Sequence, residues 1–168
     1  MKTKFIAEIS SNHFNDLERI RKIIIESKKA GCWGVKFQLF ELENLFHSSV
    51  IKSNPSLLER KKWELDRTLL PKIKMICDEL DIKLGFTPFS LNAVDFLKKY
   101  VDFFKVASYE FLWMDLIKKI EKTNLPFIVS TGMANFEEIG HFYKAFKKFN
   151  NKPAILHCRS EYPTPRKN

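Results

Sequence analysis

Two lysines embedded in apolar runs are the residues of this sequence best suited to chemistry. Lys36 lies within Val35–Phe37, and Lys105 lies within Phe104–Val106. An ammonium group in apolar surroundings is costly unless an anion neutralises its charge. Each lysine is therefore predicted to have an acidic partner, which comes either from the chain or from a bound molecule.

The nature of that partner is open at this level. A carboxylate of the chain, such as Glu8 or Glu110, would form an internal ion pair, and this is the favoured reading for one lysine alone. For two lysines that converge with the hydroxyls of Thr87, Ser108 and Ser130, we favour an anionic ligand instead. Lysines, hydroxyls and backbone N–H groups at helix starts together make a phosphate-binding site.

The elements that must position these residues form a regular alternation. Short apolar runs predict strands at Lys4–Ile9, Trp33–Leu39, Lys83–Thr87, Phe103–Ala107, Phe127–Ser130 and Ala154–Cys158. Amphipathic stretches predict helices at Asp16–Ala30, Leu65–Leu80, Leu91–Tyr100, Trp113–Lys122 and Phe136–Phe149. This order indicates parallel strands joined by crossover helices, in which polar groups gather at the carboxyl ends of the strands.

Residues at the predicted helix ends agree with this alternation. Asp16 and Ser90 are suited to cap helix starts, and Gly31 is suited to end the first helix. Asn135 followed by Glu138 resembles a capping box. Residues that commonly cap helices therefore stand at these predicted helix ends.

One connection, Phe40 to Glu64, departs from the regular alternation of strands and helices. It is long and mixed in composition, and it would follow the second strand at the end where barrel enzymes do chemistry. Loops of this length are uncommon in compact domains and are often functional.

The number of units limits the fold class. Six strands and five helices fit the sequence, whereas a closed (β/α) barrel has eight units and typically about 250 residues. The α/β fold is therefore either an incomplete TIM-type barrel or an open doubly wound sheet.

Composition limits the classes of molecule that the chain is expected to bind. The net charge of +9 suits anionic substrates or nucleic acid, but the lysines are spread along helical faces without a nucleic-acid-binding motif. We therefore expect no nucleic acid partner. No uncharged run approaches the roughly 20 residues of a membrane helix, and the apolar start is too short for a signal peptide. The expected location is cytoplasmic, without membrane association.

Cysteines and histidines give little metal-binding signal. Cys32, Cys77 and Cys158 are far apart and form no CxxC pair, which argues against a zinc knuckle or a disulfide framework. His13 has three open roles, as a surface loop residue, a ligand or a proton carrier, with the first slightly favoured. His157 has an apolar left flank and is interpreted as a buried core histidine.

Seven short motifs occur in one order across almost the whole chain. They are Ile6–His13, Gly34–Gln38, Phe86–Phe89, Phe104–Glu110, Val129–Met133, Leu156–Cys158 and Glu161–Pro165. Their order resembles that of the N-acetylneuraminate (sialic acid) synthase family, which includes the pseudaminate and legionaminate synthases. Each motif alone would be a weak signal.

The resemblance implies a (β/α)8 barrel that condenses phosphoenolpyruvate with an open-chain N-acetylated aminohexose, giving a nonulosonic acid and phosphate. It implies a divalent metal, Mn²⁺ or Mg²⁺. By motif position, the phosphoenolpyruvate-binding residues would be Lys36, Thr87, Lys105, Ser108 and Ser130. Glu8 and Glu110 would contact the sugar and assist the water and proton steps, and Gln38 and Tyr162 would line the pocket.

The chain also departs from the family pattern. Ser10 replaces a usual glycine, and Phe86 stands where serine is common. The family's two metal-binding histidines lie in later motifs, so no metal ligand is assigned within this chain. Residues 1–168 are expected to form the N-terminal part of the barrel, without the customary C-terminal antifreeze-like domain. The two open strand edges of such a fragment would be covered by a second, complementing polypeptide, by homodimerisation, or not at all.

Two other functions stay open. The chain could be a catalytically incomplete remnant or split-barrel subunit that binds phosphoenolpyruvate without turnover. It could also be another phosphoenolpyruvate-using barrel, such as a 3-deoxy sugar-acid synthase, although those enzymes lack the combination of Ser11–His13 with Tyr162–Pro165.

Overall fold

The structure, a computed structural model, describes residues 3–166 and divides into two compact units. Unit 1 runs to Asp102, and unit 2 begins at Phe103. The predicted domain includes residues 1–2 and 167–168, which lie outside the described residues. Each unit is described by itself.

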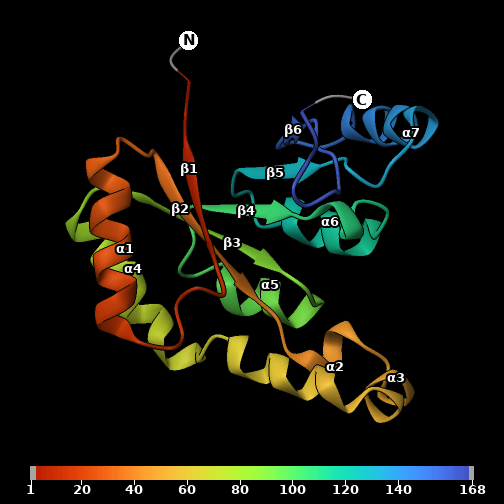
Figure 1. The fold of residues 1–168 in the computed structure, drawn as a ribbon. Coiled ribbons are helices and arrows are strands. Elements are labelled where there is room, and N and C mark those ends of the chain that lie inside the picture. The colour runs from red at the N-terminus through yellow and green to blue at the C-terminus, as the bar shows by residue number, and fades with distance from the viewer. Residues whose placement is uncertain (1–2, 167–168) are drawn as a thin grey trace. The chain divides into compact units, whose positions relative to one another are not determined.

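Unit 1 contains three parallel strands, β1 (Ile6–Ser10), β2 (Gly34–Leu39) and β3 (Lys83–Pro88), with β2 in the middle. The helices between and after them are α1 (Leu17–Lys29), α4 (Leu70–Glu79) and α5 (Leu91–Leu97). Helices α1 and α4 lie side by side (Figure 1).

The core of unit 1 explains the pattern of its elements. Ile20 and Ile24 lie one turn apart on α1 and are fully buried, as the helical spacing requires. The rings of Phe37 on β2 and Phe86 on β3 stack with their centroids 5.5 Å apart, and the two residues are register partners. The phenyl ring of Phe86, where serine is common in the family, thus fills the core between strands.

The predicted caps of unit 1 are confirmed. The side chain of Asp16 accepts hydrogen bonds from the backbone N–H groups of Glu18 and Arg19, and Ser90 accepts one from Ala93. Gly31 follows α1 with a φ of +81°, a conformation that favours glycine.

The connection after β2 is mostly helical rather than an irregular loop. It contains α2 (Leu42–Leu45), α3 (Ser48–Ser53) and the 3₁₀ segment η1 (Pro55–Trp63). A second 3₁₀ turn, η2 (Arg67–Leu69), precedes α4, so that helix begins later than predicted.

Unit 2 also contains three parallel strands, β4 (Phe103–Val106), β5 (Phe127–Ser130) and β6 (Ala154–Leu156), with β5 in the middle. A 3₁₀ turn, η3 (Ser108–Glu110), follows β4, and the helices are α6 (Met114–Glu121) and α7 (Phe136–Phe146). The predicted capping box at the start of α7 is present in full.

The α/β class and the alternation of parallel strands with helices are confirmed within each unit. The prediction for His157 is wrong, because its residue is exposed just after β6, all of whose residues are exposed. Among the described residues, none of the helices is both long and apolar enough to span a membrane.

Candidate functional site

Lys36 is buried in unit 1 beside a carboxylate. Strand register places it opposite Glu8 on β1, and only 7% of Lys36 is exposed. Its Nζ lies 2.5 Å from Glu8 Oε2 and donates to Thr87 Oγ1 at 2.8 Å. The structure therefore gathers three of the predicted site residues, Glu8, Lys36 and Thr87, across the three strands of this unit.

Glu8 supplies the negative charge that neutralises the Lys36 ammonium group in this cluster. Burial lowers the pKa of Lys36, and the charge of Glu8 and its hydrogen bond oppose that shift. The burial of Lys36 thus does not by itself require a bound anion. The Glu8 side chain is about half exposed (48%), so a solvent-borne molecule can reach the ion pair from that side.

The turn after β1 is attached to the same carboxylate. Ser10 donates its backbone N–H to Glu8 Oε1 at 2.9 Å, and its φ is +52°, in the left-handed region that favours glycine. A glycine at this position would adopt that conformation without strain.

Unit 2 gathers a second lysine with hydroxyl groups. Lys105 Nζ donates to Ser130 Oγ at 2.5 Å and to the Val106 carbonyl oxygen at 2.7 Å. Ser108 Oγ accepts the backbone N–H of Gly132 at 3.1 Å. The predicted residues Lys105, Ser108 and Ser130 therefore lie at the carboxyl ends of β4 and β5, where ligands bind in parallel sheets.

Glu110 lies in η3 at the end of β4. Burial raises its pKa, and the charge of Lys105 opposes the rise. Its Oε2 atom is buried without a hydrogen-bond partner among the described residues. A carboxyl group with a raised pKa and a free oxygen is suited to hold and donate a proton.

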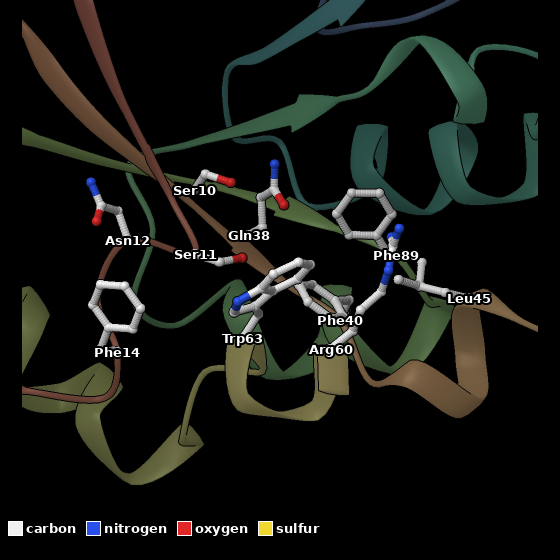
Figure 2. A pocket seen from close by; sticks show the side chains of 10 residues that line it. All are labelled: Ser10, Ser11, Asn12, Phe14, Gln38, Phe40, Leu45, Arg60, Trp63 and Phe89. Atoms are coloured by element: carbon white, nitrogen blue, oxygen red, sulfur yellow. The ribbon is translucent and has the colours of Figure 1, made fainter. Parts of the chain in front are cut away.

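A cavity of about 470 Å³ lies wholly within unit 1 (Figure 2). It lies between the connection after β1, the end of β2 and the helical connection 40–64. Its wall consists of Ser10, Ser11, Asn12, Phe14, Gln38, Phe40, Leu45, Arg60, Trp63 and Phe89. Gln38 was predicted to line a pocket, whereas Arg60 and Phe14 were missed. The position of the long connection after the second strand was the signal that could have found Arg60.

Tyr162, the other predicted pocket residue, lies in unit 2 with 94% of its surface exposed. Its role in substrate binding therefore stays a prediction.

Buried polar contacts hold one wall of this cavity in place. His13 is 1% exposed, its Nδ1 accepts the backbone N–H of Asn15 at 3.0 Å, and its ring also hydrogen-bonds the backbone of Trp63. Asn15 bonds the Glu64 carbonyl oxygen and the Asp66 N–H, each at 2.9 Å. Burial lowers the pKa of His13, so the ring is held neutral. The surface-loop interpretation of His13 is wrong, and the residue joins two loops instead.

Comparison with known proteins settles the family. Residues 23–168 match the NeuB family over most of the chain. The chain belongs to the NeuB family. This result favours the sialic acid synthase resemblance over the 3-deoxy sugar-acid synthase alternative.

Relatives of this NeuB-family chain include two curated synthases. The N,N'-diacetyllegionaminic acid synthase of Campylobacter jejuni is 34% identical, over 98% of this chain and 53% of its own length. The N-acetylneuraminate-9-phosphate synthase of Drosophila melanogaster is 30% identical, over 95% of this chain and 46% of its own length. The chain thus spans about half the length of these relatives.

A solved structure shares the fold. The N-acetylneuraminic acid synthetase of Leptospira borgpetersenii, in complex with citrate, is 27% identical with a TM-score of 0.89, covering 99% of this chain and 57% of that one.

The sialic acid synthase resemblance implies a divalent metal, for which no ligand was predicted within this NeuB-family chain. The described residues bring together no group of three or more histidine, cysteine, aspartate or glutamate side chains that could hold a metal ion. The described side chains therefore do not fit a metal site.

Proposed function

We propose that this NeuB-family chain takes part in condensing phosphoenolpyruvate with an N-acetylated amino sugar to give a nonulosonic acid and phosphate. The family and the names of its relatives support this class of reaction. Those names differ in whether the product carries a phosphate, so phosphorylated and unphosphorylated sugars are both candidate acceptors.

The observation that carries the proposal is the match to the NeuB family, and the cluster of Lys36, Glu8 and Thr87 supplies an ammonium group that an anionic substrate can share. Phosphoenolpyruvate carries a carboxylate and a phosphate that repel each other, and a fixed ammonium group offsets that repulsion. When such an anion binds, Lys36 would share its charge between the ligand and Glu8, with the Thr87 hydroxyl directing one N–H.

We propose the same anion-binding role for the lysine of unit 2. Lys105 already donates to two oxygens, and Ser108 and Ser130 add hydroxyls at the ends of the same two strands. A lysine with adjacent hydroxyls is a suitable partner for phosphate oxygens.

The reaction balances with water as the third reactant. Carbon 3 of phosphoenolpyruvate forms a bond to the aldehyde carbon, and the aldehyde oxygen takes up a proton. Carbon 2 becomes cationic and adds water, which loses a proton. The bond from carbon 2 to the phosphate oxygen then breaks, and the hydroxyl proton on carbon 2 passes to the leaving phosphate, which leaves the keto group.

Two carboxyl groups are assigned to the proton steps. Glu110, whose pKa is raised, would donate a proton to the aldehyde oxygen as negative charge develops there. Glu8, half-exposed and paired with Lys36, would orient the attacking water or the sugar hydroxyls. The divalent metal stays a prediction.

Phosphate release from the purified chain tests the proposal. The chain is incubated with phosphoenolpyruvate, Mn²⁺ and N-acetylmannosamine or other N-acetylated aminohexoses, and phosphate and the keto acid are measured together. We expect equal amounts of both, and their loss in Lys36→Met but not in Lys22→Met, which removes an exposed charge from α1. Binding of phosphoenolpyruvate without any phosphate release would favour the remnant or split-barrel alternative.

A further inference from the structure

The unit 1 cavity carries one formal charge in its wall. Arg60 is a lining residue, and none of the described lining residues is acidic. Figure 2 shows Arg60 among the side chains that line the cavity. The wall is therefore positively charged, which favours a ligand with an anionic substituent.

Arg60 differs from its neighbours in how its charge is compensated. Lys61 pairs with Glu43, and Lys62 lies 3.9 Å from Glu59. The guanidinium of Arg60 instead lies over the rings of Phe46 and Trp63, 5.7 Å from each centroid. Among the described residues it makes no ion pair, so its N–H groups are available to an anion.

The rest of the wall suits a carbohydrate. Trp63 and Phe14 offer partly exposed aromatic rings, against which the C–H faces of a sugar can pack. Gln38, Asn12 and neighbouring serines supply hydrogen-bonding groups. The volume of about 470 Å³ lies within the range of small-molecule sites. Ser10, a lining residue, is hydrogen-bonded to Glu8, so the cavity adjoins the Lys36 cluster.

We propose that this cavity binds an amino sugar bearing a phosphomonoester, with the phosphate against Arg60, so that the preferred acceptor is a phosphorylated N-acetylated aminohexose. This inference rests on the proposed function, because it names the acceptor of that reaction. The planar guanidinium can bind two phosphate oxygens at once, and its stacking on two rings fixes its orientation. The phosphate would lie at the end of the sugar away from the reacting aldehyde.

Calorimetric titration of the whole chain tests this preference. N-acetylmannosamine 6-phosphate and unphosphorylated N-acetylmannosamine are titrated at low salt into the wild type, Arg60→Gln, Arg60→Lys and Lys52→Gln. Lys52→Gln is the matched control, because it removes one charge from the same connection at a residue outside the cavity wall.

We expect the wild type and Lys52→Gln to bind the phosphorylated sugar at least tenfold more tightly, and Arg60→Gln to bind both sugars equally. Arg60→Lys should keep part of the preference, which separates loss of charge from loss of fold. Equal affinity for the two sugars in the wild type, a preference that survives in Arg60→Gln, or no binding of either sugar would overturn the inference. Inorganic phosphate that bound Arg60 as tightly as the sugar phosphate would also overturn it.

Titration with phosphoenolpyruvate separates this inference from the proposed function. Phosphoenolpyruvate should bind the wild type and Arg60→Gln alike, because Arg60 is not assigned to its site. Binding of phosphoenolpyruvate with no sugar preference would reject only the cavity inference. A sugar preference without phosphoenolpyruvate binding would reject the proposed function.

Discussion

Unit 1 and unit 2 each place a lysine in the middle of a short apolar strand, but they treat its charge differently. Lys36 is 7% exposed and is neutralised by Glu8, its register partner on the neighbouring strand. Lys105 is only partly buried, and its register partner on β5 is the apolar Ile128. Its ammonium group donates to the Ser130 hydroxyl and the Val106 carbonyl oxygen, and its charge also acts on Glu110 beyond the end of β4.

The difference shows that strand register can place an acid directly opposite a buried lysine, as it does for Lys36 and Glu8. In unit 1 the acid is one strand away at the same level, so the ammonium can be fully buried. In unit 2 the hydroxyl of Ser130 stands two residues beyond the register partner, and the lysine stays closer to solvent. The variants below test this contrast, from the largest expected effect to the smallest.

Removal of the acid in unit 1 should have the largest effect on stability. Glu8→Gln leaves a buried ammonium without its counter-charge, and we expect the free energy of unfolding to fall by about 2 kcal/mol. Urea denaturation followed by circular dichroism measures the change. Glu43→Gln, which breaks an exposed pair with Lys61, is the control and should change stability little. A loss in Glu8→Gln no larger than in the control would contradict the importance of the buried pair.

Removal of the hydroxyl in unit 2 should have a smaller effect. Ser130→Ala deletes the hydroxyl that accepts from Lys105, and we expect a loss of about 1 kcal/mol in the same denaturation experiment. A double-mutant cycle with Lys105→Met isolates the coupling between the two side chains. If Ser130→Ala destabilised the protein as much as Glu8→Gln, the contrast between the units would fail.

The turn beside the unit 1 ion pair offers a test in the opposite direction. Ser10→Gly relieves a left-handed backbone conformation, and we expect the free energy of unfolding to rise by about 0.5 kcal/mol. The neighbouring Ser11, whose φ is not positive, gives the matched control. Ser11→Gly should lower stability, and stabilisation by both substitutions would refute the assignment of strain to residue 10.

Acid should destabilise unit 1 through His13. Because burial lowers its folded-state pKa, the unfolded chain binds a proton first as the pH falls below about 6.5. The loss of stability that comes from protonation of His13 is therefore absent above that pH. It grows as the pH falls toward the folded-state pKa. Thermal unfolding from pH 7.5 to 5.5 should show a smaller loss of Tm in His13→Asn than in the wild type. His141→Gln, at an exposed position on α7, should keep the wild-type slope, and equal slopes in all three proteins would contradict a neutral buried ring.

Sequence patterns predicted the elements better than the contacts between them. All six predicted strands overlap observed ones, because each apolar run has its own boundary residues. The helices of the 40–64 connection were missed because they are too short, or too tightly wound as 3₁₀ segments, to show a 3.6-residue period.

The site residues, like the elements, were easier to predict as single positions than as pairs in contact. The motifs identified Glu8, Lys36 and Thr87 as polar residues near strand ends, but their contacts depend on register, which a single sequence does not encode directly. Arg60 lies in a 3₁₀ segment without a helical period and lacked a motif. His13 hydrogen-bonds the backbone of Trp63, fifty residues further along the chain, and a local sequence pattern cannot reveal such a contact.

Thermal unfolding in the presence of phosphoenolpyruvate tests the central claim most directly, since that claim assigns the lysine clusters to an acidic substrate. At a ligand concentration about 100 times Kd, binding stabilises a protein by about 2.7 kcal/mol, so we predict a rise in Tm of about 5–10 °C for the wild type. The rise should persist in Lys22→Met and vanish in Lys36→Met and Lys105→Ala. No rise for the wild type at millimolar phosphoenolpyruvate, or an equal rise in the lysine variants, would contradict the account.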